Sequence, residues 1–170
     1  MKKILCVIFA LTMVLSLAAC NQENPTTAGT QGTTKPTEAP KALNMAEVYT
    51  TITSGVTMPQ MMSLDESMML DLYGIRAEYC KQAAIYLCEN SLRADEIWLL
   101  EATDAASMAT LKTLMQNRLD QKDAESITYD PEQNAIVKAA QIIESGNYLV
   151  MIVSPDAAAI AEAFRSAAGI

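Results

Sequence analysis

The sequence predicts an α+β domain in which one antiparallel sheet of about four strands, arranged as two hairpins, is packed by helices on a face. Two strand signals followed by a helix signal occur twice, at about residues 83–124 and about 139–168. The segment 148–153 is apolar at every position, which is typical of a central strand. A short helical segment is expected to precede the sheet.

The helical lead-in is predicted from residues just after position 42. Leu43, Ala46, Val48 and Ile52 lie at a loosely helical spacing, and Gly55 follows as a suitable stop. This helix would open the folded domain, which is expected to occupy residues 43–170.

A second helix is expected to begin at Ser63. Ser63 and Glu66 have the spacing of a capping box, in which each side chain satisfies a backbone N–H left free by the first helical turn. The helix would carry Met68 on its apolar side and end at Tyr73. Gly74 is then free to adopt the left-handed cap.

Two strands are predicted at 83–88 and 96–102, with a connection around 89–91. The first of them also fits one face of a helix, because Cys80, Ala84 and Leu87 recur at helical spacing. Both assignments of this segment remain open from sequence.

The clearest helix is predicted over residues 104–124, and residues 130–132 predict a turn or short helix after it. The apolar residues of one face of this helix recur at three or four positions: Met108, Leu111, Met115 and Leu119. Lys112 falls on another face. The stripe is therefore expected to pack on the sheet.

The C-terminal part predicts a hairpin and a last helix. Strands at 139–144 and 148–153 are joined around Gly146 and Asn147, and Ser154-Pro155 then starts the helix with Pro at its first position. The inward residues expected in this helix are Ile160, Ala163, Phe164 and Ala167.

The N-terminal end predicts export. Lys2 and Lys3 precede an apolar run that ends in small residues before Cys20, as in a secretory signal over residues 1–19. Ala18-Ala19-Cys20 resembles the lipobox of bacterial lipoproteins. That resemblance implies lipidation of Cys20, a mature chain that begins there, and anchoring on the extracytoplasmic face of the cell membrane. An uncleaved anchor is the alternative, although the run is short for a span of about 20 residues.

Residues 20–42 predict a disordered tether, because Thr, Pro and Gly dominate and almost nothing apolar is available for burial. As a flexible coil it would span about 26 Å. Its threonines are also potential glycosylation sites.

Charge and composition limit the function classes. The 170-residue chain has a formal charge of -8, and removal of the signal with Lys2 and Lys3 leaves -10. Its bases are scattered, which disfavours nucleic acid and anionic lipid head groups as partners. The sequence has no His, the usual general base and metal ligand, so any enzyme would have to work with carboxylates, Lys, Tyr or Cys. Neither a cofactor nor an enzymatic activity is expected.

Cys80 and Cys88 remain after Cys6 leaves with the signal and Cys20 is lipidated. In one strand their Cα atoms would be about 26 Å apart, and in one helix about 12 Å. Neither distance permits a disulfide, which needs Cα atoms within about 7 Å. Two small buried hydrophobic residues are the simplest interpretation, and a partner disulfide or metal site is the alternative.

Two groups of side chains suggest chemistry. The methionines of one segment most simply fill irregular gaps in the apolar core. A partner-binding apolar surface is one alternative, and a Cu(I) site is another, because thioether sulfur suits Cu(I). Paired carboxylates also permit glycoside hydrolysis. The methionines are Met58, Met61, Met62, Met68 and Met69. The carboxylates are Glu89, Asp95, Glu96 and Glu101. Further acids around the end of the long helix, residues 120–132, lack the glycine and alternation of a calcium loop.

The lipobox and tether are followed by three short motifs, at residues 71–75 (Asp-Leu-Tyr-Gly-Ile), 94–97 (Ala-Asp-Glu-Ile) and 146–148 (Gly-Asn-Tyr). In this order they resemble a family of small lipoproteins of Gram-positive bacteria that carry domain of unknown function 4358. The resemblance extends from about Leu43 to the C-terminus and implies a location and a fold, with no activity. A non-enzymatic binding or accessory module with an unknown protein or small-molecule partner is therefore expected.

Overall fold

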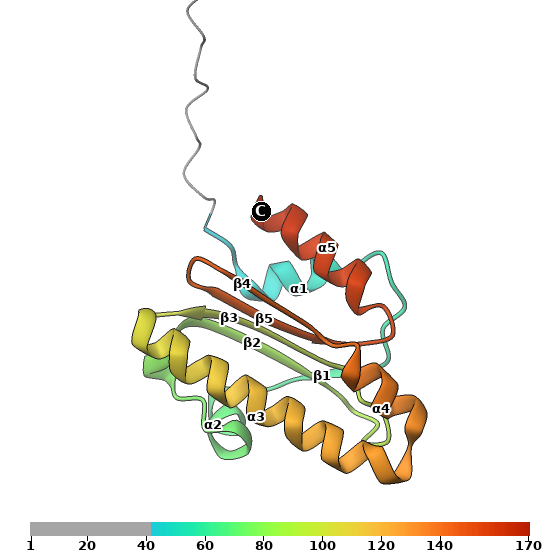
Figure 1. Ribbon diagram of the computed structural model, residues 1–170. Helices are drawn as coiled ribbons and strands as arrows, with labels where there is room; N and C mark the ends of the chain where they lie inside the picture. Colours follow the sequence, from blue (N-terminus) through green and yellow to red (C-terminus); the bar gives the residue numbers. More distant parts are fainter. Residues whose placement is uncertain (1–41) are drawn as a thin grey trace, which may run out of the picture. The chain divides into compact units, whose positions relative to one another are not determined.

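The computed structural model describes residues 42–170, which form an α+β domain around one five-stranded antiparallel sheet. Neighbouring strands follow the order β1-β2-β3-β5-β4 (Figure 1). The strands are β1 (Met61–Ser63), β2 (Cys80–Cys88), β3 (Glu96–Ala102), β4 (Gln141–Ser145) and β5 (Tyr148–Val153). The helices are α1 (Met45–Thr53), α2 (Glu66–Tyr73), α3 (Ala105–Tyr129), α4 (Pro131–Lys138), α5 (Ala157–Ala168) and the 3-10 turn η1 (Ala77–Tyr79).

Helices cover both faces of the sheet, whereas the sequence predicted helices on one face. Figure 1 shows α1 and α5 on one side and α2, α3 and α4 on the other. Two buried apolar clusters separate in the same way: Phe164 and Ile97 belong to the first, and Trp98 and Leu111 to the second. Because successive strand residues point to opposite faces, the apolar strands β3 and β5 supply both clusters.

The expected α+β class and both hairpins are confirmed, and the alternative helix for Cys80–Cys88 is excluded because β2 spans that segment. The strand count of four is wrong by one. Met61–Ser63 forms the edge strand β1, which pairs with residues 86–88 of β2. Three residues are too few for an alternating pattern to be recognised in sequence.

The start of α2 also differs from the prediction. Ser63 lies in β1, and Asp65 caps the helix by accepting a hydrogen bond from Met68 N–H at 2.9 Å. The end is as expected, because Gly74 adopts the left-handed conformation with φ of 69°. In α5 the helix begins at Ala157, so Pro155 precedes it and is not its first residue.

The predicted long helix is α3, which starts at its cap Asp104 and continues to Tyr129, beyond the expected end at residue 124. Leu111 and Met115 are completely buried, as the stripe predicted. Within the described part of the chain, no helix is long and apolar enough to span a membrane. The predicted signal, Cys20 and the tether up to Lys41 lie outside the described residues.

Leu111→Asp is expected to prevent folding, because an unpaired buried charge costs several kcal/mol. Lys112→Ala should cost about 1 kcal/mol or less, since Lys112 is half-exposed and forms its ion pair with the half-exposed Glu144. Circular dichroism with thermal unfolding measures both effects. Equal losses at the two positions would contradict the register of α3.

Candidate functional site

The most constrained polar group of the described chain is the carboxylate of Glu96, which is completely buried at the start of β3. Trp98 Nε1–H donates to its Oε1 at 2.7 Å. Arg118 donates from Nε to both carboxylate oxygens at 3.1 Å and from Nη2 to Oε2 at 2.8 Å. Lys122 Nζ lies 3.0 Å from Oε2. We call these four residues the Glu96 cluster.

Local geometry brings the Glu96 cluster together. Glu96 and Trp98 are two residues apart on a strand and therefore face the same side of the sheet. Arg118 and Lys122 are four residues apart on α3 and therefore share one face of the helix. The ring of Tyr73, at the end of α2, lies 5.2 Å from the Arg118 guanidinium carbon and 4.7 Å from the Trp98 ring. The cluster thus joins β3 to α3 and α2.

The electrostatics of the cluster favour the ionised carboxylate. Burial would raise the pKa of Glu96, but hydrogen bonds from Arg118 and the charge of Lys122 outweigh it, so that pKa lies below its ordinary value. Burial and the Glu96 charge both raise the pKa of the Tyr73 hydroxyl. At neutral pH the cluster is therefore a charged glutamate held by two cations beside a neutral tyrosine.

The acids predicted for hydrolysis do not converge. Glu89 is exposed, Asp95 pairs with Arg93 at 2.9 Å, and Glu101 accepts from the Gln82 side chain at 2.9 Å. Strand alternation places Asp95 and Glu101 on the face opposite Glu96. Among the described residues, these carboxylates form no facing pair of the kind that glycosidases use.

The methionines are divided between the two faces of the sheet. Met58 packs against the cluster that contains Phe164, whereas Met68 and Met69 belong to the side of Trp98. Met61 and Met62 alternate along β1 and so point to opposite faces. The segment predicted as a possible Cu(I) site therefore does not bring its sulfurs to one point.

Cys80 and Cys88 are free thiols at opposite ends of β2, consistent with the expectation that they cannot pair within one element. Burial raises the pKa of the Cys80 thiol to about 11. The acids after residue 119 serve α3 and α4: Asp130 caps α4, and Asp123 accepts from Asn134. Within residues 42–170, no group of three His, Cys, Asp or Glu side chains is placed to hold a metal ion.

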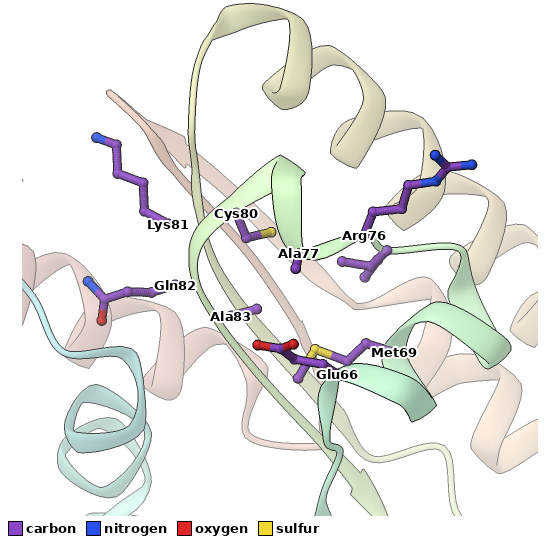
Figure 2. Close-up of a pocket in the computed structure, with 9 residues that line it drawn as sticks. Glu66, Met69, Arg76, Ala77, Cys80, Lys81, Gln82 and Ala83 are labelled. Atoms are coloured by element: carbon purple, nitrogen blue, oxygen red, sulfur yellow. The ribbon is translucent and has the colours of Figure 1, made fainter.

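A cavity of about 100 Å³ lies beside the first half of β2, and we call it the β2 cavity (Figure 2). The side chains of Met69, Ala77, Cys80 and Ala83 surround it, and the Glu66 carboxylate is turned toward them in Figure 2. Other residues in its lining are Ile75, Arg76, Lys81 and Gln82. An apolar wall with a charged rim therefore faces the solvent between α2, η1 and β2.

The same half of β2 has an open backbone edge. β1 pairs with β2 only as far as Tyr86, and Leu64 N–H then donates to the carbonyl of Ile85 at 2.9 Å before the chain turns away into α2. Backbone groups of alternate residues point to the same side of a strand. Ala83 therefore directs its N–H and C=O outward, as Ile85 does. Among the described residues, no backbone hydrogen bond reaches Ala83 from that outer side.

A second hollow of about 320 Å³ lies between the β2–β3 connection and helices α3 and α4. Two cations line it, Lys122 and Arg93. Lys122 Nζ is held by the Ala94 carbonyl at 3.0 Å and by Glu96, and Arg93 is held by Asp95. Both cations are therefore already engaged with buried acids of the fold, and two further acids, Glu125 and Asp130, also line this hollow.

Sequence reasoning named Glu96 but missed its partners. Arg118 and Lys122 are four residues apart on the strongest predicted helix and so share one face, a spacing that points to a common counter-charge. The β2 cavity carries no comparable signal. Its lining comes from α2, η1, β2 and the turn between them, which only the folded chain assembles.

The described residues define a small α+β domain with an open antiparallel sheet and a partly uncovered edge. The chain belongs to the family described as Domain of unknown function (DUF4358), which matches residues 54–154. No curated protein matches the chain significantly. The solved structures likewise contain no significant match.

Glu96→Gln should destabilise the domain by about 3 kcal/mol, because it leaves two cations without a buried counter-charge. The matched variant Glu144→Gln removes a half-exposed carboxylate and should cost about 1 kcal/mol or less. Denaturant unfolding measures both. Similar costs for the two variants would contradict the role of the Glu96 cluster.

Low pH should destabilise the domain through protonation of Glu96. The pKa of Glu96 is lower in the folded protein than its ordinary value of 4.5. Ionised Glu96 therefore stabilises the fold fully at pH values above 4.5, and this stabilisation is lost as the pH falls from 4.5 through the folded-state pKa. The wild type should therefore lose more unfolding free energy than Glu96→Gln between about pH 7 and about pH 3. Parallel pH profiles for the two proteins would rule out Glu96 as the source.

Proposed function

We propose that this protein is a membrane-anchored lipoprotein on the extracytoplasmic face, and that its domain is a non-enzymatic binding or accessory module. The proposal for location rests on the signal-like residues 1–19 and on Cys20 in its lipobox-like context. The Thr- and Pro-rich segment up to Lys41 would serve as the tether, with a reach of about 26 Å from the membrane.

The observation that supports the binding role is that the candidate catalytic acids have partners within the fold, whereas backbone groups at one strand edge do not. The candidate catalytic acids Asp95, Glu96 and Glu101 are each held by a separate cation or amide within the fold. The β2 cavity instead adjoins a strand edge whose backbone groups have no partner among the described residues. Such an edge can recognise another molecule without moving a proton or breaking a bond.

Charge supports a partner that is neutral or basic. Of the chain's 20 acids and 12 bases, two acids and four bases precede residue 42, which leaves 18 acids and 8 bases on the described domain. Its net charge is therefore -10. Long-range attraction would favour a cationic partner and would disfavour nucleic acid.

Cys20→Ser tests the anchor. The variant should leave the membrane fraction, while the wild type should stay there with an acylated N-terminal Cys20. Cell fractionation and mass spectrometry of the mature N-terminus make the comparison. A mature wild-type protein with an unmodified Cys20, or one that retains Lys2, would refute lipidation.

A photo-crosslinking side chain at Ala77 tests the binding role in the living cell. Ala77 is exposed and lines the β2 cavity, so crosslinked products should form there. The same side chain at the exposed Ala159 of α5, across the sheet, is the control and should give none. Identical patterns from both positions, or no product from either, would contradict a binding module that uses this surface.

A further inference from the structure

We infer that the partner is an extended, basic peptide segment of another protein, which adds as a strand to the free edge of β2 and inserts one apolar side chain into the β2 cavity. This inference rests on the proposed binding function and gives it a chemical class. It combines three observations: the unpaired strand edge, the size and lining of the cavity, and the charge at its rim.

The strand edge determines the conformation of the ligand. The pairing of β1 with β2 ends beside Tyr86 and Ile85, and no described backbone group hydrogen-bonds to the outer side of Ala83, on the line that β1 follows. A backbone N–H and C=O that point outward from one residue match the pairing of an antiparallel strand. An extended peptide on this line would continue β1 and satisfy both groups of Ala83.

The position and size of the β2 cavity determine which side chain of the peptide it accepts. Strand residues alternate between faces, so a peptide beside β2 directs every second side chain toward α2 and η1. The β2 cavity holds about 100 Å³ between Met69, Ala77 and Ala83. This is room for one aliphatic side chain and too little for a whole drug-sized ligand, whose pockets span about 300 Å³ or more.

The charge at the rim of the β2 cavity determines the charge that the peptide should carry. Glu66 is exposed at the start of α2 with its carboxylate turned toward the cavity, as Figure 2 shows. No ion pair joins Glu66 to a cation of the described domain. Arg76 and Lys81 also line the cavity, but they pair with Glu78 and Glu101, and Figure 2 shows their cationic ends turned away from it. Together with the domain charge of -10, Glu66 therefore favours a Lys or Arg beside the inserted apolar residue.

Two other occupants fit this site less well. A second copy would bring another charge of -10 to the same edge, and like net charges oppose association. The chain's own tether has Pro36 and Pro40 immediately before the domain, and proline cannot donate a hydrogen bond to a strand ladder.

The test begins with a phage-displayed library of random heptapeptides, selected on the full-length protein in detergent micelles. Enriched peptides are synthesised, and their binding to variants is measured by fluorescence anisotropy. Ala83→Pro deletes the outward N–H without touching the β2–β3 ladder, which uses the alternate residues. Ala77→Phe fills the mouth of the cavity from an exposed position, and Ala159→Phe is its matched control on α5.

The enriched peptides should share one apolar residue with a Lys or Arg close beside it. Ala83→Pro and Ala77→Phe should each weaken binding by about tenfold or more, while Ala159→Phe stays within about twofold. Glu66→Lys should weaken binding chiefly at low salt, and Glu162→Lys, the same charge change on α5, should not. Thermal unfolding checks the fold of each variant, and Ala77→Phe decides the test if Ala83→Pro does not fold.

Several results would overturn the inference. They are the absence of any enriched peptide, or peptides whose binding is unchanged by both Ala83→Pro and Ala77→Phe. Binding that arises only after deletion of residues 21–41 would make the tether the occupant. A dimer that Ala77→Phe or Ala83→Pro abolishes would make a second copy the occupant. Crosslinking at Ala77 without peptide binding would keep the binding module and overturn only strand addition.

Discussion

The buried carboxylate of Glu96 is the constraint on which the rest of this domain depends. A charge with no exposure to water is tolerable only if cations and hydrogen-bond donors surround it. Arg118, Lys122 and Trp98 meet that requirement together. Because both cations project from α3, the requirement holds the longest helix in one place and one rotation on the sheet.

The same constraint extends to α2. The Tyr73 ring lies against both Arg118 and Trp98, so the end of α2 is held at the Glu96 cluster. Gly74 then adopts φ of 69°, a conformation that L side chains rarely adopt, and the chain turns through the buried Ile75 back to η1 and β2. The β2 cavity lies inside this turn. The interior charge cluster therefore holds in place the wall of the surface that we propose binds a partner.

Sequence patterns predicted the regular parts of the fold because those parts have strong local periodicity. β5 and α3 each carry an apolar pattern that a single element explains, and both were found close to their predicted positions. β1 was not predicted because three residues carry no period. Ser63 was predicted as a helix cap from its spacing to Glu66, whereas the observed cap is Asp65, two residues later, which has the same capping chemistry. The second layer of helices was missed because topology alone decides which face each helix covers.

The candidate site was less predictable for a related reason. Glu96 was named only as one of four acids that could form a pair. Its cationic partners lie on α3, the next element along the chain, and spacing within one element gives no direct information on a contact between two elements. The open edge of β2 depends on where β1 stops, a property of strand pairing that no residue type encodes. The length of an element, its capping residue and its apolar stripe depend on local sequence. Ion pairs between elements and the unpaired edges of strands depend on how the whole sheet is assembled.

The central claim is that the folded frame leaves the first half of β2 uncovered, and amide hydrogen exchange of the full-length protein tests it most directly. Ala84 donates its N–H into the ladder with β3, whereas the N–H of Ala83 points to the opposite side. The account predicts that the Ala83 amide exchanges much faster than the Ala84 amide under native conditions. Equal, strong protection of the two amides would contradict it, because a partner would then already occupy this edge.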